Sequence, residues 1–365
     1  MTAALNTALL LALFCLMALH PPIPRHSHPF NLQFALGWWI NEAPLVGLWW
    51  LIAGTIGTLI NAESGFWWWA IAGLTAIDLL MLGWIMLRAH DARPALSDAL
   101  ARTFGPHAAM QFTRPHWWRL ILPIISWRPD VRRVSNVRYG PHGRGNRLDV
   151  YHPRRRLRGK AAPVLVYFHS ALGSKLLGSH PLIYRLAAHG WVCVSAGRRQ
   201  FGASYADQLA DARAALEWVR DNAAVFGGDP TRIVASGGSA GANLAATAGL
   251  TSTDVAAVVC LYGFYGRLGP GAEPTSPHQV IGPGAPPFLI VHGSLDTLVP
   301  SREARTFAAS LDAASTAPVA YAELPGTQHS FDVFHSVRFQ AVTDSVVRFA
   351  ELVLDDTVGT DSVEA

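Results

Sequence analysis

Three long apolar runs dominate the first ninety residues of the chain. Residues 3–19 and 43–60 contain no charged side chain, and residues 66–87 contain only Asp78. A membrane-spanning helix needs roughly 17–25 predominantly apolar residues, so each run is long enough to cross a bilayer. The pattern therefore predicts a membrane anchor with three transmembrane helices in residues 1–90.

Tryptophan residues flank the predicted spans. Trp38 and Trp39 precede the second span, and three more tryptophans occupy residues 67–69 at the start of the third. Aromatic side chains are enriched at the membrane interface, so this placement is typical of interfacial anchors. Residues 3–19 could alternatively be a cleaved signal peptide, but the run lacks a preceding basic segment and a following A-x-A site. These features favour a retained helix.

From about residue 131 the pattern changes to short β-rich runs separated by helical segments. Residues 207–225 and 336–353 carry apolar side chains on one helical face. This alternation predicts an α/β fold, with a mainly parallel sheet flanked by helices, over residues 131–354. Residues 355–365 are read as an acidic tail. The predicted strands are residues 163–168, 191–195, 232–236, 255–261, 288–292 and 318–323.

Charge is scarce and unevenly distributed. Half of the residues are hydrophobic and 15% are charged, against about 25% charged residues in an average soluble protein. Residues 91–160 carry fifteen basic side chains against four acidic ones. We expect residues 91–130, rich in Arg, Pro and Trp, to form a juxtamembrane connector that contacts anionic lipid headgroups rather than nucleic acid.

The clearest chemical motif is Gly237-Gly238-Ser239-Ala240-Gly241. It directly follows the predicted strand at 232–236 and precedes a helix of small residues at 242–249. A G-x-S-x-G sequence at a sharp strand-to-helix turn exposes the serine hydroxyl at the edge of the sheet. This context predicts Ser239 as a nucleophile, and the backbone N–H of Ala240 can help to stabilise an oxyanion.

A serine nucleophile needs a base and an orienting acid, and in this type of fold the acid precedes the histidine in the chain. Asp296 follows the predicted strand at 288–292, and His329 follows the strand at 318–323. Since the carboxyl ends of parallel strands share one edge of the sheet, we expect both side chains to lie near the serine. Asp332 is a rival acid, but its place before the last helix predicts a capping role.

Four segments of this region resemble those of one esterase family. They are Gly227-Gly-Asp-Pro-Thr-Arg-Ile, Gly238-Ser-Ala-Gly-Ala-Asn-Leu, His292-Gly-Ser-Leu-Asp and Gly326-Thr-Gln-His-Ser-Phe, in this order. Residues 131–354 thus resemble an α/β-hydrolase of the hormone-sensitive-lipase-like esterase family. The resemblance implies that Ser239 is the nucleophile, His329 the base and Asp296 the orienting acid, with no metal or organic cofactor. The multi-span anchor resembles arrangements in some actinobacterial esterases.

One segment departs from the family pattern. The family usually carries H-G-G-G after its third strand, whereas this chain has His169-Ser170-Ala171-Leu172-Gly173. Glycine enters backbone conformations that other residues adopt reluctantly. We expect the backbone N–H groups of Ala171 and Leu172 to serve as oxyanion donors beside Ala240, at some cost in rate. The short segment 262–287 predicts a site that is open or covered by residues 117–127.

The sequence therefore predicts a membrane-anchored serine carboxylic ester hydrolase that acts through an acyl-enzyme. The substrate is an ester, with lipid esters among the candidates. One alternative is a serine peptidase of related fold. Another is a catalytically inert hydrolase-like membrane protein used for binding, which the altered oxyanion segment favours and the complete Ser-His-Asp set opposes. Basic residues lie on the catalytic side of the spans, so the positive-inside rule predicts a multi-pass cell-membrane protein with a cytoplasmic catalytic domain.

Overall fold

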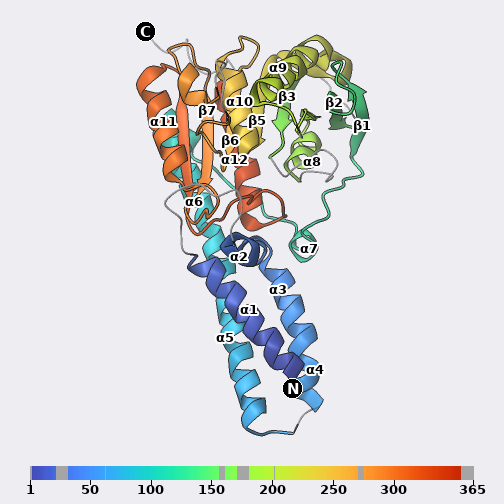
Figure 1. Cartoon of the computed structure of the whole chain (residues 1–365), viewed down its shortest axis with the longest axis vertical. Coiled ribbons are helices and arrows are strands. Elements are labelled where there is room, and N and C mark those ends of the chain that lie inside the picture. The colour runs from blue at the N-terminus through green and yellow to red at the C-terminus, as the bar shows by residue number, and fades with distance from the viewer. Residues whose placement is uncertain are drawn as a thin grey trace.

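The computed structural model describes residues 2–21, 32–61, 63–155, 161–170, 181–200, 202–269 and 275–354. In this part of the chain, a bundle of apolar N-terminal helices lies at one end of a larger α/β unit (Figure 1). Two of the predicted oxyanion residues, Ala171 and Leu172, lie outside the described residues, as does the predicted acidic tail at 355–365.

The α/β unit is built on an eight-stranded sheet with the order β1-β2-β4-β3-β5-β6-β7-β8. The pairs β1–β2 and β2–β4 are antiparallel, and all other neighbours are parallel, which confirms the predicted mainly parallel sheet. The six predicted strands correspond to β3–β8, while β1 and β2 were not predicted. The bounds are β1 Val131–Arg138, β2 Arg147–Pro153, β3 Ala162–Phe168, β4 Val192–Ala196, β5 Gly228–Gly238, β6 Ala257–Leu261, β7 Phe288–Gly293 and β8 Val319–Leu324.

Helices cover both faces of this sheet. Successive strand residues point to opposite faces, so Leu165 belongs to one hydrophobic core and Val166 to the other. One face is covered by α6 (Ala92–Phe104), α8 (Pro181–Ala188) and α12 (Val337–Leu354). The other is covered by α9 (Tyr205–Asn222), α10 (Ala240–Leu250) and α11 (Arg302–Ala314).

Helix α6 lies within the region that the sequence assigned to a connector. Its Leu96 and Leu100 are buried in the core, and Phe104 packs edge-on against Phe349 of α12 with 6.1 Å between ring centroids. The α/β unit therefore takes part of its core from residues that precede its first strand. The short helix α7 (Trp117–Ile121) follows farther along the same region.

Three helical stretches of the described residues are long and apolar enough to cross a membrane: Thr2–Leu19, Pro44–Asn61 and Phe66–Phe104. The first is α1, the second combines α3 (Pro44–Leu51), a π-helical turn and α4 (Gly57–Asn61), and the third begins with α5 (Phe66–Arg88). Leu11 and Leu82 lie in the core of the bundle, whereas Ile60 and Leu80 are each 75% exposed on its outside. The bundle thus has a packed interior and an apolar outer surface.

Helix α2 (Leu32–Glu42) was not predicted from the sequence. It connects α1 to α3 and lies at the junction between the apolar bundle and the α/β unit (Figure 1). The loops after β8 rest against it, because the Trp38 indole N–H donates to the carbonyl of Ser330. Trp38 therefore contacts the α/β unit and is not simply the interfacial anchor that its sequence position predicted.

Candidate active site

Ser239 stands at the sharp turn between β5 and α10. Its backbone has φ 57° and ψ −122°, a left-handed conformation that is unusual for a residue with a side chain. A Cβ atom on Gly241 would collide with the carbonyl oxygen of Phe168 at the end of β3, so this position needs glycine. The strained turn and its small neighbours match the local geometry that the G-x-S-x-G motif requires.

His329 and Asp296 form a short, buried hydrogen bond. The distance from His329 Nδ1 to Asp296 Oδ2 is 2.6 Å. The other carboxyl oxygen accepts from the backbone N–H groups of Leu298 and Val299, at 2.9 and 2.8 Å. The structure thus brings together the base and the acid that the sequence predicted, and the acid is held in place from both of its oxygens.

The environment of Asp296 favours its charged form. Burial by itself would raise the pKa of this carboxyl, but the charge of His329 and hydrogen bonds from His292 and His329 lower that pKa well below its ordinary value. An ionised carboxylate at this position can fix the orientation of the His329 imidazole and can stabilise an imidazolium there.

His292, which opens one of the four family-like segments, also contacts Asp296, although no role was predicted for it. Its Nε2 lies 3.2 Å from Asp296 Oδ2 and 2.8 Å from the carbonyl oxygen of Val299. The ring is fully buried. It therefore links β7 to the loop that carries the acid.

Tyr262 packs against both the serine turn and the histidine. Its ring packs edge-on against His329, with 4.6 Å between the centroids. Its phenol also lies against Gly238, where a Cβ atom would come within 2.5 Å of the phenol Cζ. The Ser239 turn and His329 thus pack against one aromatic side chain. Within the described residues no hydrogen bond joins the two, and catalytic hydrogen bonds of this kind are often longer in free enzymes.

Asp332 does not cap the last helix, so that prediction is wrong. Helix α12 begins at Val337, and the Ser336 hydroxyl accepts from the backbone N–H of Phe339 at 3.0 Å. Asp332 is instead fully buried and accepts from the hydroxyl groups of Tyr262 and Tyr167, at 2.6 and 3.3 Å. Its carboxylate supports Tyr262, whose ring packs against His329.

The end of β3, which leads into the predicted oxyanion segment, is fixed by polar side chains. The His169 carbonyl accepts from Arg198 Nη1 at 2.9 Å, and His169 Nε2 lies 2.7 Å from the Ser195 hydroxyl. Arg198 is held in turn by Gln208 at 3.0 Å. Ala240 is the first residue of α10, where backbone N–H groups lack partners within the helix.

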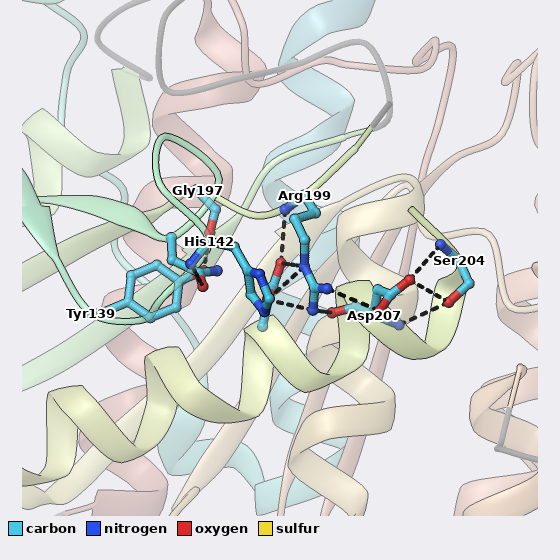
Figure 2. Close-up of polar contacts among 8 residues, drawn as sticks. Tyr139, His142, Gly197, Arg199, Ser204 and Asp207 are labelled. Carbon is cyan, nitrogen blue, oxygen red and sulfur yellow. Dashed lines mark hydrogen bonds and ion pairs between the residues drawn. The ribbon is translucent and has the colours of Figure 1, made fainter. Parts of the chain in front are cut away.

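Arg199, the residue after Arg198, belongs to the network in Figure 2, which fixes the segment after β4. The Arg199 guanidinium donates to Asp207 at 2.9 Å and to Asp211 at 2.9–3.1 Å. Ser204 and Asp207 form a reciprocal capping box at the start of α9. These contacts order the backbone next to Arg198, a residue that the sequence did not single out.

Part of the N-terminal region packs against the candidate site and against the loop that follows it. Phe34 of α2 lies edge-on to His329 with 6.1 Å between the ring centroids. The segment 117–127 packs beside the loop after His329, where the His335 N–H donates to the carbonyl of Pro123 at 2.9 Å. Arg119 also lies 3.0 Å from His335 Nε2.

Comparison with known proteins identifies esterases over most of the chain. A family model described as BD-FAE matches residues 148–261. The probable carboxylic ester hydrolase LipM of Mycobacterium tuberculosis is 30% identical, with the alignment covering 93% of this chain and 91% of LipM. From the same organism, esterase LipC is 33% identical over 76% of this chain and 80% of LipC. Esterase LipQ is 32% identical over 64% of this chain and 65% of LipQ.

Solved structures show the same fold. Esterase B from Lactobacillus rhamnosis superposes with a TM-score of 0.55 at 17% identity, covering 73% of this chain and 96% of that one. Thermogutta terrifontis esterase 2 superposes with a TM-score of 0.53 at 24% identity, covering 64% and 97%. These superpositions cover 73% and 64% of this chain, so part of it lies outside the shared α/β fold.

Proposed function

The chain belongs to the hormone-sensitive-lipase-like esterase family of α/β-hydrolases and is a carboxylic ester hydrolase, and from this premise we propose that Ser239, His329 and Asp296 form its catalytic triad. The observation that carries the proposal is the 2.6 Å hydrogen bond between His329 Nδ1 and Asp296 Oδ2. His329 packs against Tyr262, which also lies against Gly238 of the Ser239 turn. The test is the loss of ester hydrolysis when Ser239 is replaced, argued in the Discussion.

In the proposed mechanism the Ser239 hydroxyl attacks the ester carbonyl carbon while His329 Nε2 accepts its proton. Asp296 stabilises the resulting imidazolium through Nδ1. The tetrahedral intermediate expels the alcohol, which takes the proton from His329 and leaves an acyl-enzyme. A water molecule, deprotonated by His329, then releases the carboxylic acid and restores the serine.

The proposed oxyanion donors are the backbone N–H groups of Ala240, Ala171 and Leu172. The position of Ala240 at the start of α10 and the fixed end of β3 support this assignment. Loss of one such donor typically lowers the rate about 10²–10³-fold. The departure from H-G-G-G therefore bears on the rate of the enzyme rather than on its reaction.

We further propose that residues 1–90 form a three-span membrane anchor, that residues 105–130 lie beside the membrane surface, and that residues 131–354, together with α6, form the catalytic domain. The apolar outer surface of the bundle supports an environment of lipid chains. Trp67 and Trp69 are 55% and 67% exposed at the start of α5, as expected for an interfacial belt. Ester substrates that partition into the bilayer would then lie close to the site.

The proposed orientation places the catalytic domain on the cytoplasmic side of the membrane. The N-terminal end of α1 and the connection from α4 to α5 lie at the end of the bundle farthest from the α/β unit (Figure 1). That end has Glu63 and no Lys or Arg, whereas Arg88, Arg93 and Arg102 lie toward the catalytic side. Under the positive-inside rule, a cytoplasmic reporter fused after residue 365 should be active and an alkaline phosphatase fusion silent. The reverse result would place the domain outside.

Replacement of Asp78 tests whether the interior of the proposed anchor takes part in catalysis. It is fully buried in α5, and neither carboxyl oxygen has a hydrogen-bond partner among the described residues. Intramembrane carboxylates are often functional, but the proposed triad lies wholly in the α/β unit. Asp78→Asn should therefore leave kcat/KM for a soluble ester unchanged in detergent. A large loss of activity at normal expression would instead couple this span to the site.

A further inference from the structure

Helix α2 meets the loop that carries His329 at two points, one on each side of the histidine. On the C-terminal side of His329, the Trp38 indole N–H donates to the Ser330 carbonyl at 3.2 Å. Ser330 has φ 58°, a strained conformation for a residue other than glycine. A hydrogen bond to this peptide therefore helps to hold the backbone immediately after His329 in a conformation that it would not adopt by itself.

The Trp38 ring is itself fixed by aromatic neighbours. It stacks on Phe34 with 5.3 Å between centroids, and it packs against Phe334 at 5.0 Å. Phe34 in turn presents its ring to the edge of His329. The indole N–H is thus directed at the Ser330 carbonyl by packing on both sides.

On the N-terminal side of His329, the carboxyl end of α2 binds the carbonyl of Gly326. Asn41 Nδ2 donates to this oxygen at 3.1 Å, and Arg338 Nη2 donates to the same oxygen at 3.1 Å. Arg338 Nη1 also donates to the Asn41 carbonyl at 2.6 Å. Arg338 is fully buried and Asn41 is 1% exposed, so these bonds form away from solvent. The last carbonyls of a helix lack partners within it, and Arg338 supplies one here.

The same junction joins α2 to the apolar bundle. Arg88, at the end of α5, donates to the Asn41 side-chain oxygen at 3.0 Å and to the Ala18 carbonyl of α1 at 2.9 Å. Glu42 accepts from Asn41 at 2.9 Å and lies 3.4 Å from Arg338. Arg338 and Glu42 thus form a buried ion pair beside Asn41, and the hydrogen bonds of Arg88 connect this pair to α1 and α5.

We propose that α2 is part of the active site, with Trp38 and Asn41 as positioning residues for His329. The inference rests on the proposed catalytic role of His329. Between the two held carbonyls, of Gly326 and Ser330, lie only three residues, and the third is the histidine. Both carbonyls accept hydrogen bonds from a helix that lies about 290 residues earlier in the chain. The N-terminal region therefore completes the catalytic geometry, in addition to any role as an anchor.

Two single replacements test this proposal in the full-length protein solubilised in detergent. Trp38→Phe keeps the stacked ring and removes the indole donor, and Asn41→Ala removes the donor to Gly326. Displacement of a catalytic group by about 1 Å can cost about 10²-fold in rate. We expect kcat to fall about 5-fold in Trp38→Phe and about 10- to 30-fold in Asn41→Ala, with KM within about 2-fold of wild type, since a partial displacement acts on the chemical steps.

The chain offers a matched control for each variant. Trp68→Phe removes an indole-to-carbonyl bond to Leu59 (2.9 Å), and Asn61→Ala removes an amide-to-carbonyl bond to Gly57 (2.7 Å), both at the opposite end of the apolar bundle. Both controls should keep the wild-type kcat. Melting curves of all four variants verify that the fold is retained, and Trp38→Phe decides the matter if Asn41→Ala does not fold.

The possible outcomes separate this inference from the proposed triad. Unchanged kcat in Trp38→Phe and in folded Asn41→Ala, with activity abolished in His329→Ala, would overturn the positioning role and leave the triad standing. An equal fall in the control variants would also overturn it, because the effect would then belong to the whole bundle. Full activity in His329→Ala would remove the triad itself.

Discussion

Replacement of Ser239 with alanine should lower ester hydrolysis by about 10⁴-fold or more without unfolding the protein. The reason is local: the residue occupies the strained turn between β5 and α10, where its hydroxyl is the proposed nucleophile. Alanine can keep the backbone hydrogen bonds of the turn, including that from the Ser239 N–H to the Leu261 carbonyl at 3.0 Å. The measurement is kcat/KM for a p-nitrophenyl ester, beside a melting curve of the same preparation.

Ser236→Ala is the matched control for this prediction. Ser236 is a fully buried serine on β5, the strand that leads into the Ser239 turn, and its hydroxyl has no hydrogen-bond partner among the described residues. Its replacement should leave activity near wild type. A fluorophosphonate probe should label the wild type and Ser236→Ala but not Ser239→Ala. Retention of more than about a tenth of the wild-type rate in Ser239→Ala would reject this serine as the nucleophile, because loss of a nucleophile costs far more.

The second large loss of activity is expected on replacement of Asp296, the proposed acid of the triad. Asp296→Asn should lower kcat by about 10³- to 10⁴-fold, since an amide cannot stabilise the imidazolium and can hold the imidazole in the wrong tautomer. The amide oxygen can still accept from the backbone N–H groups of Leu298 and Val299, so the loop should keep its shape. Comparison of kcat for several esters, with thermal unfolding as a check, measures the effect.

Asp332→Asn is the control acid, three residues after the histidine. Its amide oxygen can still accept from Tyr262, which packs against His329. We expect a loss of about 10-fold or less, because Asp332 acts on the histidine through the tyrosine ring. If Asp332→Asn were the more damaged of the two variants in kcat, the acid of the triad would have been assigned to the wrong residue.

Local patterns in the sequence were enough to predict the elements that carry the proposed chemistry. The six buried strands stand out because parallel strands covered on both faces form continuous apolar runs. The small residues around Ser239 mark a turn where larger side chains would collide with the neighbouring strand. The loop positions of Asp296 and His329 follow from the rule that the carboxyl ends of parallel strands share one edge.

Elements whose structure depends on distant contacts could not be found in this way. Helix α2 is short and follows no clear amphipathic pattern, and its tryptophans resemble interfacial anchors. Helix α6 lies in a basic segment, and only its packing against β8 and α12 shows that it belongs to the catalytic core. Asp332 accepts hydrogen bonds from Tyr262 and Tyr167, which lie 70 and 165 residues earlier in the chain.

The sequence by itself was enough to predict the three long apolar runs, the α/β fold and the candidate triad. The runs and the fold follow from local hydrophobic periodicity, and the triad residues follow from their places directly after predicted strands. Only the tertiary structure decided which segment packs against the site and what holds the histidine loop. The Asn41–Gly326 and Trp38–Ser330 hydrogen bonds join residues 285 and 292 positions apart. Such pairings have no periodicity along the chain, because they form only when separately folded elements pack together.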